Sequence, residues 1–197
     1  MGRLRVVGGA LRGRWVRVPD DLPGVRPTSE RAREAIFDIL GPAWTAGAAV
    51  LDLYAGTGAL GIEALSRGAA RSDFVEGNRA VAALLRKNLE SLGLGARGRV
   101  VVADLDRGDL PQGVKGPWNV VFLDPPYATE SGARWLERLG REAWPPDGAL
   151  VVYEHRSGST LDPPTGLALA VERAYGDTAV SIYRAGGSGP PAERGAS

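Results

Sequence analysis

The chain has 197 residues, of which 24% are charged, and its formal net charge is only +1. This length suits one α/β domain with a complete core and a small appendage. The chain contains no cysteine and a single histidine, His155, which excludes disulfides, thiolate or histidine-rich metal sites and a cysteine nucleophile. Because no apolar run is long enough for a signal peptide or a membrane span, a soluble cytoplasmic protein is expected.

The amino-terminal segment predicts a basic hairpin. Two strand-like runs, LRVV and RWVRV, flank GGALRG within residues 3–18. Five arginines precede the first acid, Asp20: Arg3, Arg5, Arg12, Arg14 and Arg17. A basic ribbon that also carries Trp15 suits phosphate contact and base stacking. The alternative is an edge hairpin whose charges only prevent aggregation.

Arginine dominates the basic residues of the whole chain, because only Lys87 and Lys115 among the 24 are lysines. Arginine forks that recognise nucleic acid would explain this bias. A genome rich in G and C also favours arginine, and the composition leaves both explanations open.

A proline-rich link precedes TSERAREAIFDILG, which predicts an amphipathic helix with Thr28 as its N-cap and with Gly41 and Pro42 at its end. Its apolar stripe must pack on the main domain. The stripe consists of Ala32, Ala35, Ile36, Ile39 and Leu40. Three arginines near the start either face a substrate phosphate or pair with neighbouring glutamates on a solvated face. They are Arg26, Arg31 and Arg33.

The following segment alternates strand-like and helical patterns, which is typical of a doubly wound sheet. Strands are expected near residues 48–54, 72–76, 99–103, 118–123 and 149–154. Helices are expected near residues 59–67, 79–92 and 131–140, the second between Asn78 as N-cap and Gly93. Alternation around Gly176 and Asp177 predicts a final antiparallel hairpin. Residues 186–197 carry no large apolar side chain and are expected to be disordered.

The stretch AAVLDLYAGTGALG, residues 48–61, is the centre of this organisation. An apolar run with one acid, Asp52, predicts a buried parallel strand, and a turn on Gly56, Gly58 and Gly61 leads into a helix. Such a turn lets a ligand approach the backbone and the helix amino end, although a tight turn without a ligand is the alternative. Glu76 ends the next strand, where a carboxylate would bind ribose hydroxyls. We therefore expect an adenosine derivative as the ligand.

Asp104 and Asp124 follow two more of the expected strands, at the sheet edge where ligands bind. Asp104 is expected to accept from the exocyclic amine of adenine. Asp52 is expected to hold the loop backbone, or a ligand ammonium through water. Each of these acids alone would be an ordinary cap at a strand end.

The most specific motif is DPPY, which spans Asp124 to Tyr127. Two prolines fix the backbone, so the carboxylate and a carbonyl can both accept from one –NH2 group. Tyr127 offers a ring face on which a flat base can stack. Two acceptors on an exocyclic amine favour a pyramidal nitrogen whose lone pair points at an electrophile. A simple Pro-Pro turn would explain the prolines but not the flanking aspartate and tyrosine.

Taken together, LDLYAGTGALGIEALSRGA, Glu76, Asp104 and DPPY resemble class I S-adenosylmethionine-dependent amino-methyltransferases. The segments RVVGGALRGR and RPTSERAREAIFDIL, with their spacing to LDLYAGTGALG, are similar to the bacterial 16S rRNA guanine-N2 methyltransferase family. The resemblance runs from Arg3 to Tyr183, nearly the whole chain.

This resemblance implies a Rossmann-like α/β fold, with a mostly parallel seven-stranded sheet, helices on both faces and an N-terminal β-hairpin plus helix. It implies RNA contact by residues 1–41, a methyltransferase domain at 42–185 and a tail at 186–197. The implied reaction transfers a methyl group from S-adenosylmethionine to the N2 amine of one guanine in 16S rRNA, leaves S-adenosylhomocysteine and uses no metal. The implied substrate particle is the 30S subunit or its assembly intermediate, with the enzyme assumed monomeric.

Residues are assigned to roles only where they match the family's motifs. The cofactor residues are then Asp52, Ala55, Gly56, Thr57, Gly58, Glu76, Asp104 and Leu105. The catalytic residues are Asp124, Pro125, Pro126 and Tyr127. The substrate-binding residues are Arg12, Arg14, Arg26 and Tyr127.

Three other functions remain open from the sequence. DPPY also serves adenine-N6 and cytosine-N4 methylation of DNA, although a short hairpin without a separate target-recognition domain counts against it. The glycine pattern and Glu76 would suit an NAD-dependent oxidoreductase, which leaves DPPY unexplained. A non-catalytic RNA-binding assembly factor on a methyltransferase fold is the third alternative.

Overall fold

The computed structural model describes residues 2–19, 30–126, 131–142, 144–159 and 162–186. The chain divides into two compact units, Met1–Lys115 and Gly116–Ser197. The expected Thr28 cap, Arg26, Tyr127 and the tail from residue 187 lie outside the described residues.

The first unit contains a parallel three-stranded sheet in the order β5-β4-β3. Its strands are β3 (Ala49–Leu53), β4 (Arg71–Glu76) and β5 (Gly98–Val102). Two helices connect them, α3 (Ala59–Ser66) and α4 (Arg79–Ser91). The register pairs Leu53 with Val75 and Glu76 with Val102, so the three carboxyl ends meet at one edge.

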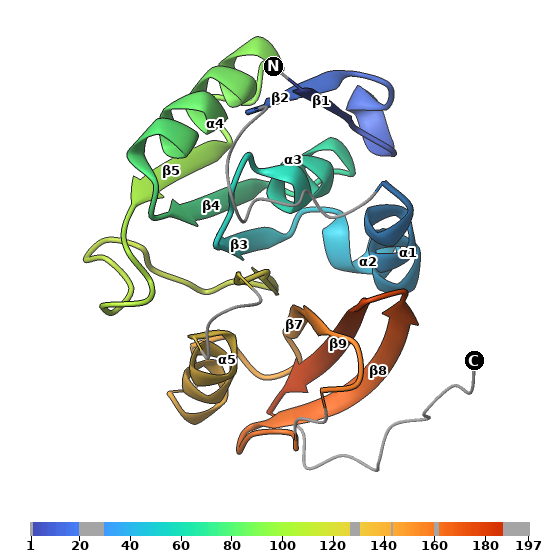
Figure 1. The fold of residues 1–197 in the computed structure, drawn as a ribbon, viewed down its shortest axis with the longest axis vertical. Coiled ribbons are helices and arrows are strands. Elements are labelled where there is room, and N and C mark those ends of the chain that lie inside the picture. Colours follow the sequence, from blue (N-terminus) through green and yellow to red (C-terminus); the bar gives the residue numbers. More distant parts are fainter. Residues whose placement is uncertain (1, 20–29, 127–130, 143, 160–161, 187–197) are drawn as a thin grey trace. The chain divides into compact units, whose positions relative to one another are not determined.

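The two connecting helices begin and end as the sequence predicts. The side chain of Asn78 accepts from the backbone N–H groups of Ala80 and Val81 and so caps α4. Gly93 follows α4 in the left-handed region, with φ of 72°, where glycine is favoured. Both helices contact strands of the sheet (Figure 1).

The basic segment forms the expected hairpin, β1 (Gly2–Arg5) and β2 (Trp15–Val18), joined through a short 3-10 helix at Gly9–Leu11. Alternate residues on its two strands are buried: Leu4, Val16 and Val18. The arginines and Trp15 lie on the other, exposed face, where Arg3 pairs in register with Arg17. The 3-10 helix contacts α3 and β2 contacts α4, so these helices lie between hairpin and sheet (Figure 1).

Polar side chains fix the hairpin to α3. Glu63 is 1% exposed; its Oε2 accepts from the N–H of Val7 at 2.9 Å, and its Oε1 pairs with Arg67. The hydroxyl of Ser66 accepts from the N–H of Leu11 and donates to the carbonyl of Gly8 at 2.6 Å. The hairpin is therefore held by partly buried hydrogen bonds as well as by its apolar face.

The predicted amphipathic helix is α1 (Glu30–Leu40), followed by a short helix, α2 (Pro42–Thr45), that the sequence did not indicate. The expected roles of Arg33 were wrong, because its side chain is fully buried and donates to the carbonyl of Arg5 at 2.7 Å. Burial has the largest effect on the Arg33 guanidinium and lowers its pKa. The negative charges of Glu63 and Glu30 oppose this shift. Ile39 is exposed, and Phe37 takes its place in the buried stripe.

The second unit contains four strands in the order β6-β7-β9-β8. These are β6 (Val120–Leu123), β7 (Leu150–Arg156), β8 (Leu167–Tyr175) and β9 (Thr178–Ala185). β6 and β7 are parallel, and β8 and β9 form the expected antiparallel hairpin around Gly176 and Asp177. Helix α5 (Ser131–Arg141) contacts β6 and β7.

Five of these seven strands run parallel to a neighbour, which confirms a mostly parallel seven-stranded arrangement with an N-terminal hairpin. Within the described ranges, no helix is both long enough and apolar enough to cross a membrane.

Candidate active site

The glycine loop begins where β3 ends and is tightly folded. The N–H of Ala55 donates to the carbonyl of Val75, and the N–H of Gly58 donates to the carbonyl of Ala55 at 2.8 Å. Tyr54 has a φ of 58°, a left-handed conformation that is uncommon for a residue with a side chain. Backbone strain of this kind gathers at functional sites.

Two glycines of the loop have different surroundings. A Cβ on Gly58 would run into the Cδ1 methyl of Leu85 on α4, so a side chain at this position would have to displace Leu85. Apart from its two chain neighbours, a Cβ on Gly56 would meet no atom of the described residues within 4 Å, so these residues leave the space beside it open. Both glycines have positive φ, 53° for Gly56 and 86° for Gly58. Glycine is favoured at both positions because it adopts positive φ without steric cost, and at Gly56 it also leaves room for a ligand.

Glu76 is hydrogen-bonded to the loop. Its Oε2 accepts from the N–H of Gly56 at 2.8 Å, and its Oε1 accepts from the N–H of Asn78 at 2.7 Å. An ionised carboxylate has about four acceptor sites, so two remain for hydroxyl groups. The acid predicted to bind ribose thus lies directly beside the open space at Gly56.

Asp52 is buried behind the loop and is 2% exposed. Its Oδ2 accepts from the N–H of Gly61, in the first turn of α3, at 2.9 Å. Burial raises its pKa to about 8, the Gly61 hydrogen bond opposes this rise, and the charge of Glu76 adds to it. Asp52 therefore holds a backbone N–H group, as expected, but that group belongs to the first turn of α3 and not to the loop before it.

The acid after β5 is exposed, as a ligand contact requires. Oδ1 of Asp104 accepts from the N–H of Asp106, and its Oδ2 lies 3.5 Å from Nε of Arg107. Leu105 beside it is buried. Asp106, for which no sequence motif predicted a role, accepts from the hydroxyl of Tyr54 at 2.9 Å. This bond joins the segments that follow β3 and β5.

Asp124, Pro125 and Pro126 directly follow β6 in the second unit. Asp124 is half-buried, Pro125 is buried and Pro126 is exposed. A Cβ on Gly132 of α5 would lie 2.5 Å from Cγ of Pro125 and 2.7 Å from the hydroxyl of Tyr153. This close packing fixes the backbone of the motif, and its signal in the sequence is a glycine inside a predicted helix.

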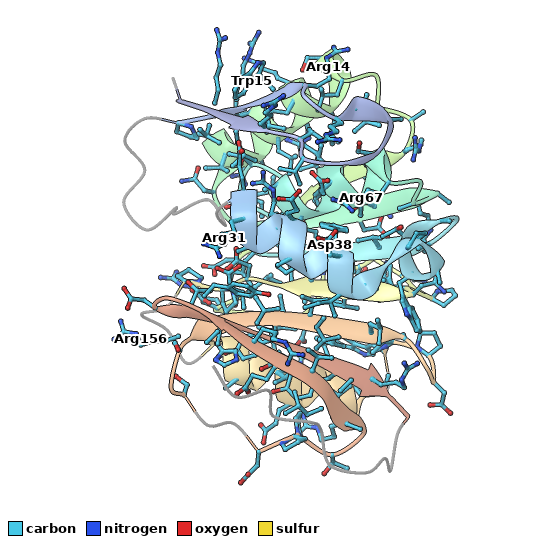
Figure 2. The ribbon with its side chains drawn as sticks, turned by 90° about the vertical axis from the view of Figure 1, so that its right-hand side faces the viewer. Arg14, Trp15, Arg31, Asp38, Arg67 and Arg156 are labelled. Atoms are coloured by element: carbon cyan, nitrogen blue, oxygen red, sulfur yellow. The ribbon has the colours of Figure 1, made fainter. Side chains whose placement is uncertain are left out.

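The arginines proposed to bind substrate, Arg12 and Arg14, lie exposed on the hairpin segment. Arg14 reaches the carbonyl of Ser91 at the end of α4 at 3.4 Å. Trp15 is 51% exposed, a large fraction for a tryptophan. Figure 2 labels its side chain beside the hairpin. In the parts of the chain that the structure describes, no cluster of three or more histidine, cysteine or acidic side chains could hold a metal ion.

Several solved structures that resemble this chain are described as methyltransferases. One, described as "Putative methyltransferase yhhF from Escherichia coli", has a TM-score of 0.78 and 38% identity, and the match covers 93% of this chain and 98% of its own. An RNA methyltransferase from Salinibacter ruber, in complex with S-adenosylhomocysteine, shares the fold with a TM-score of 0.60 at 18% identity. The chain therefore has the Rossmann-like class I methyltransferase fold.

Residues 4–184 match the family model described as Conserved hypothetical protein 95, and the chain belongs to that family. Among its relatives is "Ribosomal RNA small subunit methyltransferase D" of Escherichia coli K12, 39% identical over 184 residues, which are 93% of this chain and 90% of the relative. The protein of that name from Haemophilus influenzae is 33% identical over 93% of this chain and 94% of its own.

Proposed function

We propose that the protein transfers a methyl group from S-adenosylmethionine to the N2 amine of a guanine in small-subunit ribosomal RNA, leaving S-adenosylhomocysteine. The observation that carries this proposal is the sequence Asp124-Pro125-Pro126 directly after β6, in a chain whose β3 leads into a glycine loop. The names of its relatives supply the class of RNA.

The residues around the loop fit the cofactor. Gly56 leaves open space, Glu76 retains acceptor sites for ribose hydroxyls, and exposed Asp104 can accept from an adenine amine. When bound, S-adenosylmethionine would supply a methyl group made electrophilic by its sulfonium. We assign binding to this loop, to Glu76, and to Asp104 with Leu105 as an apolar neighbour.

Asp124 and the carbonyl of Pro125 would accept the two hydrogens of the guanine amine. This contact draws the nitrogen lone pair out of conjugation and directs it at the methyl carbon. Transfer would break the C–S bond as the C–N bond forms, and Asp124 or water would then take the proton that the methylated nitrogen loses. Most of the rate would come from proximity and orientation. Tyr127 is proposed as the stacking platform for the flipped base.

The hairpin is the proposed rRNA contact. Arg3 and Arg17 face each other across the two strands, an arrangement of like charges that destabilises a hairpin on its own. A phosphate backbone would neutralise this repulsion, and Trp15 would stack on an unpaired base. Arg12, Arg14 and Arg26 are assigned to the same contact. We propose that the monomeric enzyme acts in the cytoplasm on the 30S subunit or its assembly intermediate.

The test is transfer of labelled methyl from S-adenosylmethionine to unmethylated small subunits, naked 16S rRNA and DNA in parallel, followed by nucleoside analysis. The expected product is N2-methylguanosine in one rRNA segment. Label in adenine or cytosine of DNA would overturn the substrate but keep the amine chemistry. Binding of NAD without S-adenosylmethionine, or cofactor binding without transfer to any substrate, would overturn the proposal.

A further inference from the structure

Asn88 lies on α4 with its side chain fully buried. Its Oδ1 accepts from the N–H of Arg17 on β2, and its Nδ2 donates to the carbonyl of the same residue, both at 3.0 Å. The same Nδ2 donates to the carbonyl of Thr57 in the glycine loop at 3.4 Å. One side chain therefore bonds the basic hairpin and the cofactor loop.

The orientation of this amide follows from its partners. The amide oxygen faces an N–H, whereas the amide nitrogen faces two carbonyls, and a flipped amide would place oxygen against oxygen. Both Nδ2 hydrogens are used, one toward each segment. Because the amide is planar and fully buried, a displacement of one carbonyl changes the hydrogen bond to the other.

The two segments joined by Asn88 are those that the proposed function assigns to different substrates. Asn88 binds the backbone of Arg17, whereas the Arg17 side chain lies on the exposed face of the hairpin, opposite Arg3. Thr57 lies between Gly56, whose N–H donates to Glu76, and Gly58. Leu85, one turn before Asn88 on α4, closely contacts the loop at Gly58.

We propose that Asn88 is a positioning residue that couples RNA binding at the hairpin to cofactor binding at the glycine loop. The inference rests on the proposed function, because it takes RNA as the ligand of the hairpin. Binding of RNA would fix the backbone of Arg17, and Asn88 would then hold Thr57 in the position that accepts the cofactor. By linkage, the cofactor tightens RNA binding by the same factor.

The first experiment measures the dissociation constant of S-adenosylhomocysteine by calorimetry, with and without saturating 16S rRNA transcript. In the wild type, RNA is expected to tighten binding at least about fivefold. In Asn88→Ala this factor is expected to fall to near one. Ser66→Ala is the matched control, because Ser66 also bonds the hairpin but lies at the far end of α3 from the loop. It is expected to keep the wild-type factor.

A second measurement uses only the wild type and stands if Asn88→Ala does not fold. Hydrogen exchange of the Arg17 amide, which donates to Asn88, is compared with that of the Val6 amide, which donates to Arg14 within the hairpin. S-adenosylhomocysteine is expected to slow exchange at Arg17 and leave Val6 unchanged.

The outcomes separate this inference from the proposed function. Three results would overturn the coupling even if methyl transfer to rRNA occurs. The first is that RNA leaves the affinity for S-adenosylhomocysteine unchanged in the wild type, and the second is that RNA tightens this binding in Asn88→Ala as much as in the wild type. The third is that S-adenosylhomocysteine slows exchange of the Arg17 and Val6 amides equally. Absence of transfer to any RNA, with selective slowing at Arg17, would instead overturn the proposed function and leave the link between hairpin and loop supported.

Discussion

The carboxylate of Glu76 accepts from the backbone N–H of Gly56 at 2.8 Å, across 20 residues of sequence. The same carboxylate accepts from the N–H of Asn78 just before α4. The predicted ribose acid is therefore oriented by two backbone donors before any ligand arrives. Such pre-organisation lowers the cost of binding, because the side chain has little freedom left to lose.

Replacing Glu76 by glutamine tests this arrangement. The Glu76→Gln amide keeps one acceptor but loses the charge and turns an NH2 group toward backbone N–H donors. Since hydrogen bonds to charged groups contribute about 1.5–3 kcal/mol, affinity for S-adenosylmethionine should fall by roughly ten- to a hundredfold. Calorimetry measures the loss. The control is Glu90→Gln, an exposed acid on α4, and equal affinities of both variants would contradict the assignment.

Asp52 predicts a pH dependence of stability. Its pKa in the folded protein is raised to about 8, so between pH 3.8 and 8 the folded state binds more protons than the unfolded state. The stabilising contribution of the neutral acid is therefore complete below the lower value and is lost as pH rises toward 8. The free energy of unfolding should fall by at most about 1.4 kcal/mol per pH unit within this window.

The measurement is urea unfolding of the ligand-free protein across that window, with Asp52→Asn as the comparison. An asparagine Oδ1 can still accept from the N–H of Gly61, but it does not titrate. The difference in stability between wild type and variant should therefore grow with pH in favour of Asp52→Asn. A difference that stays constant with pH would show that Asp52 is ionised throughout.

Asp124→Ala should lower methyl transfer by at least about a hundredfold, because one of two acceptors that orient the amine is lost. Affinity for S-adenosylmethionine should stay nearly unchanged, since the assigned cofactor residues lie elsewhere in the chain. Single-turnover transfer to rRNA and calorimetry separate the two effects. Asp162→Ala, an exposed acid in the same unit, is the control. Normal turnover of Asp124→Ala would remove the residue from the catalytic role.

The sequence predicted the regular elements well because their signals are local. The strand at 49–53, the helix capped by Asn78 and the hairpin at Gly176-Asp177 each follow from periodicity, caps or turn residues within a few positions. The short helix α2 escaped notice because four residues carry too little periodicity.

The contacts that fix the hairpin could not be predicted from local patterns. Arg33, Glu63 and Asn88 are charged or polar residues that periodicity assigns to a surface, yet all three are buried by partners distant in sequence. Their burial depends on the docked hairpin, which supplies backbone groups to satisfy them. The left-handed Tyr54 depends likewise on the folded loop and on Asp106.

Trp15→Ala should weaken RNA binding by roughly five- to a hundredfold, because stacking of a base on an aromatic ring contributes about 1–3 kcal/mol. Stability should change by less than about 0.5 kcal/mol, since the ring is half exposed. Fluorescence anisotropy with a labelled 16S rRNA fragment measures the affinity. Ile39→Ala, which truncates an exposed apolar side chain on α1, should leave RNA affinity unchanged. Equal effects of the two variants would exclude stacking on Trp15.

Gly9 and Gly13 offer a matched pair for testing how the hairpin is docked. Both have positive φ, 73° and 85°, so alanine should cost about 1–2 kcal/mol at either position from backbone conformation alone. A Cβ at Gly9 would also collide with the carbonyl of Ser66 on α3, whereas at Gly13 the nearest side chain atom, Nη2 of Arg5, lies 3.6 Å away. Gly9→Ala should therefore destabilise the protein more than Gly13→Ala in urea unfolding.

Gly9→Ala should also speed hydrogen exchange of the Val7 and Leu11 amides, which donate to side chains of α3. Equal losses in the two variants would mean that the hairpin shifts on α3 to accommodate the added methyl group, which would contradict close docking of Gly9 against Ser66.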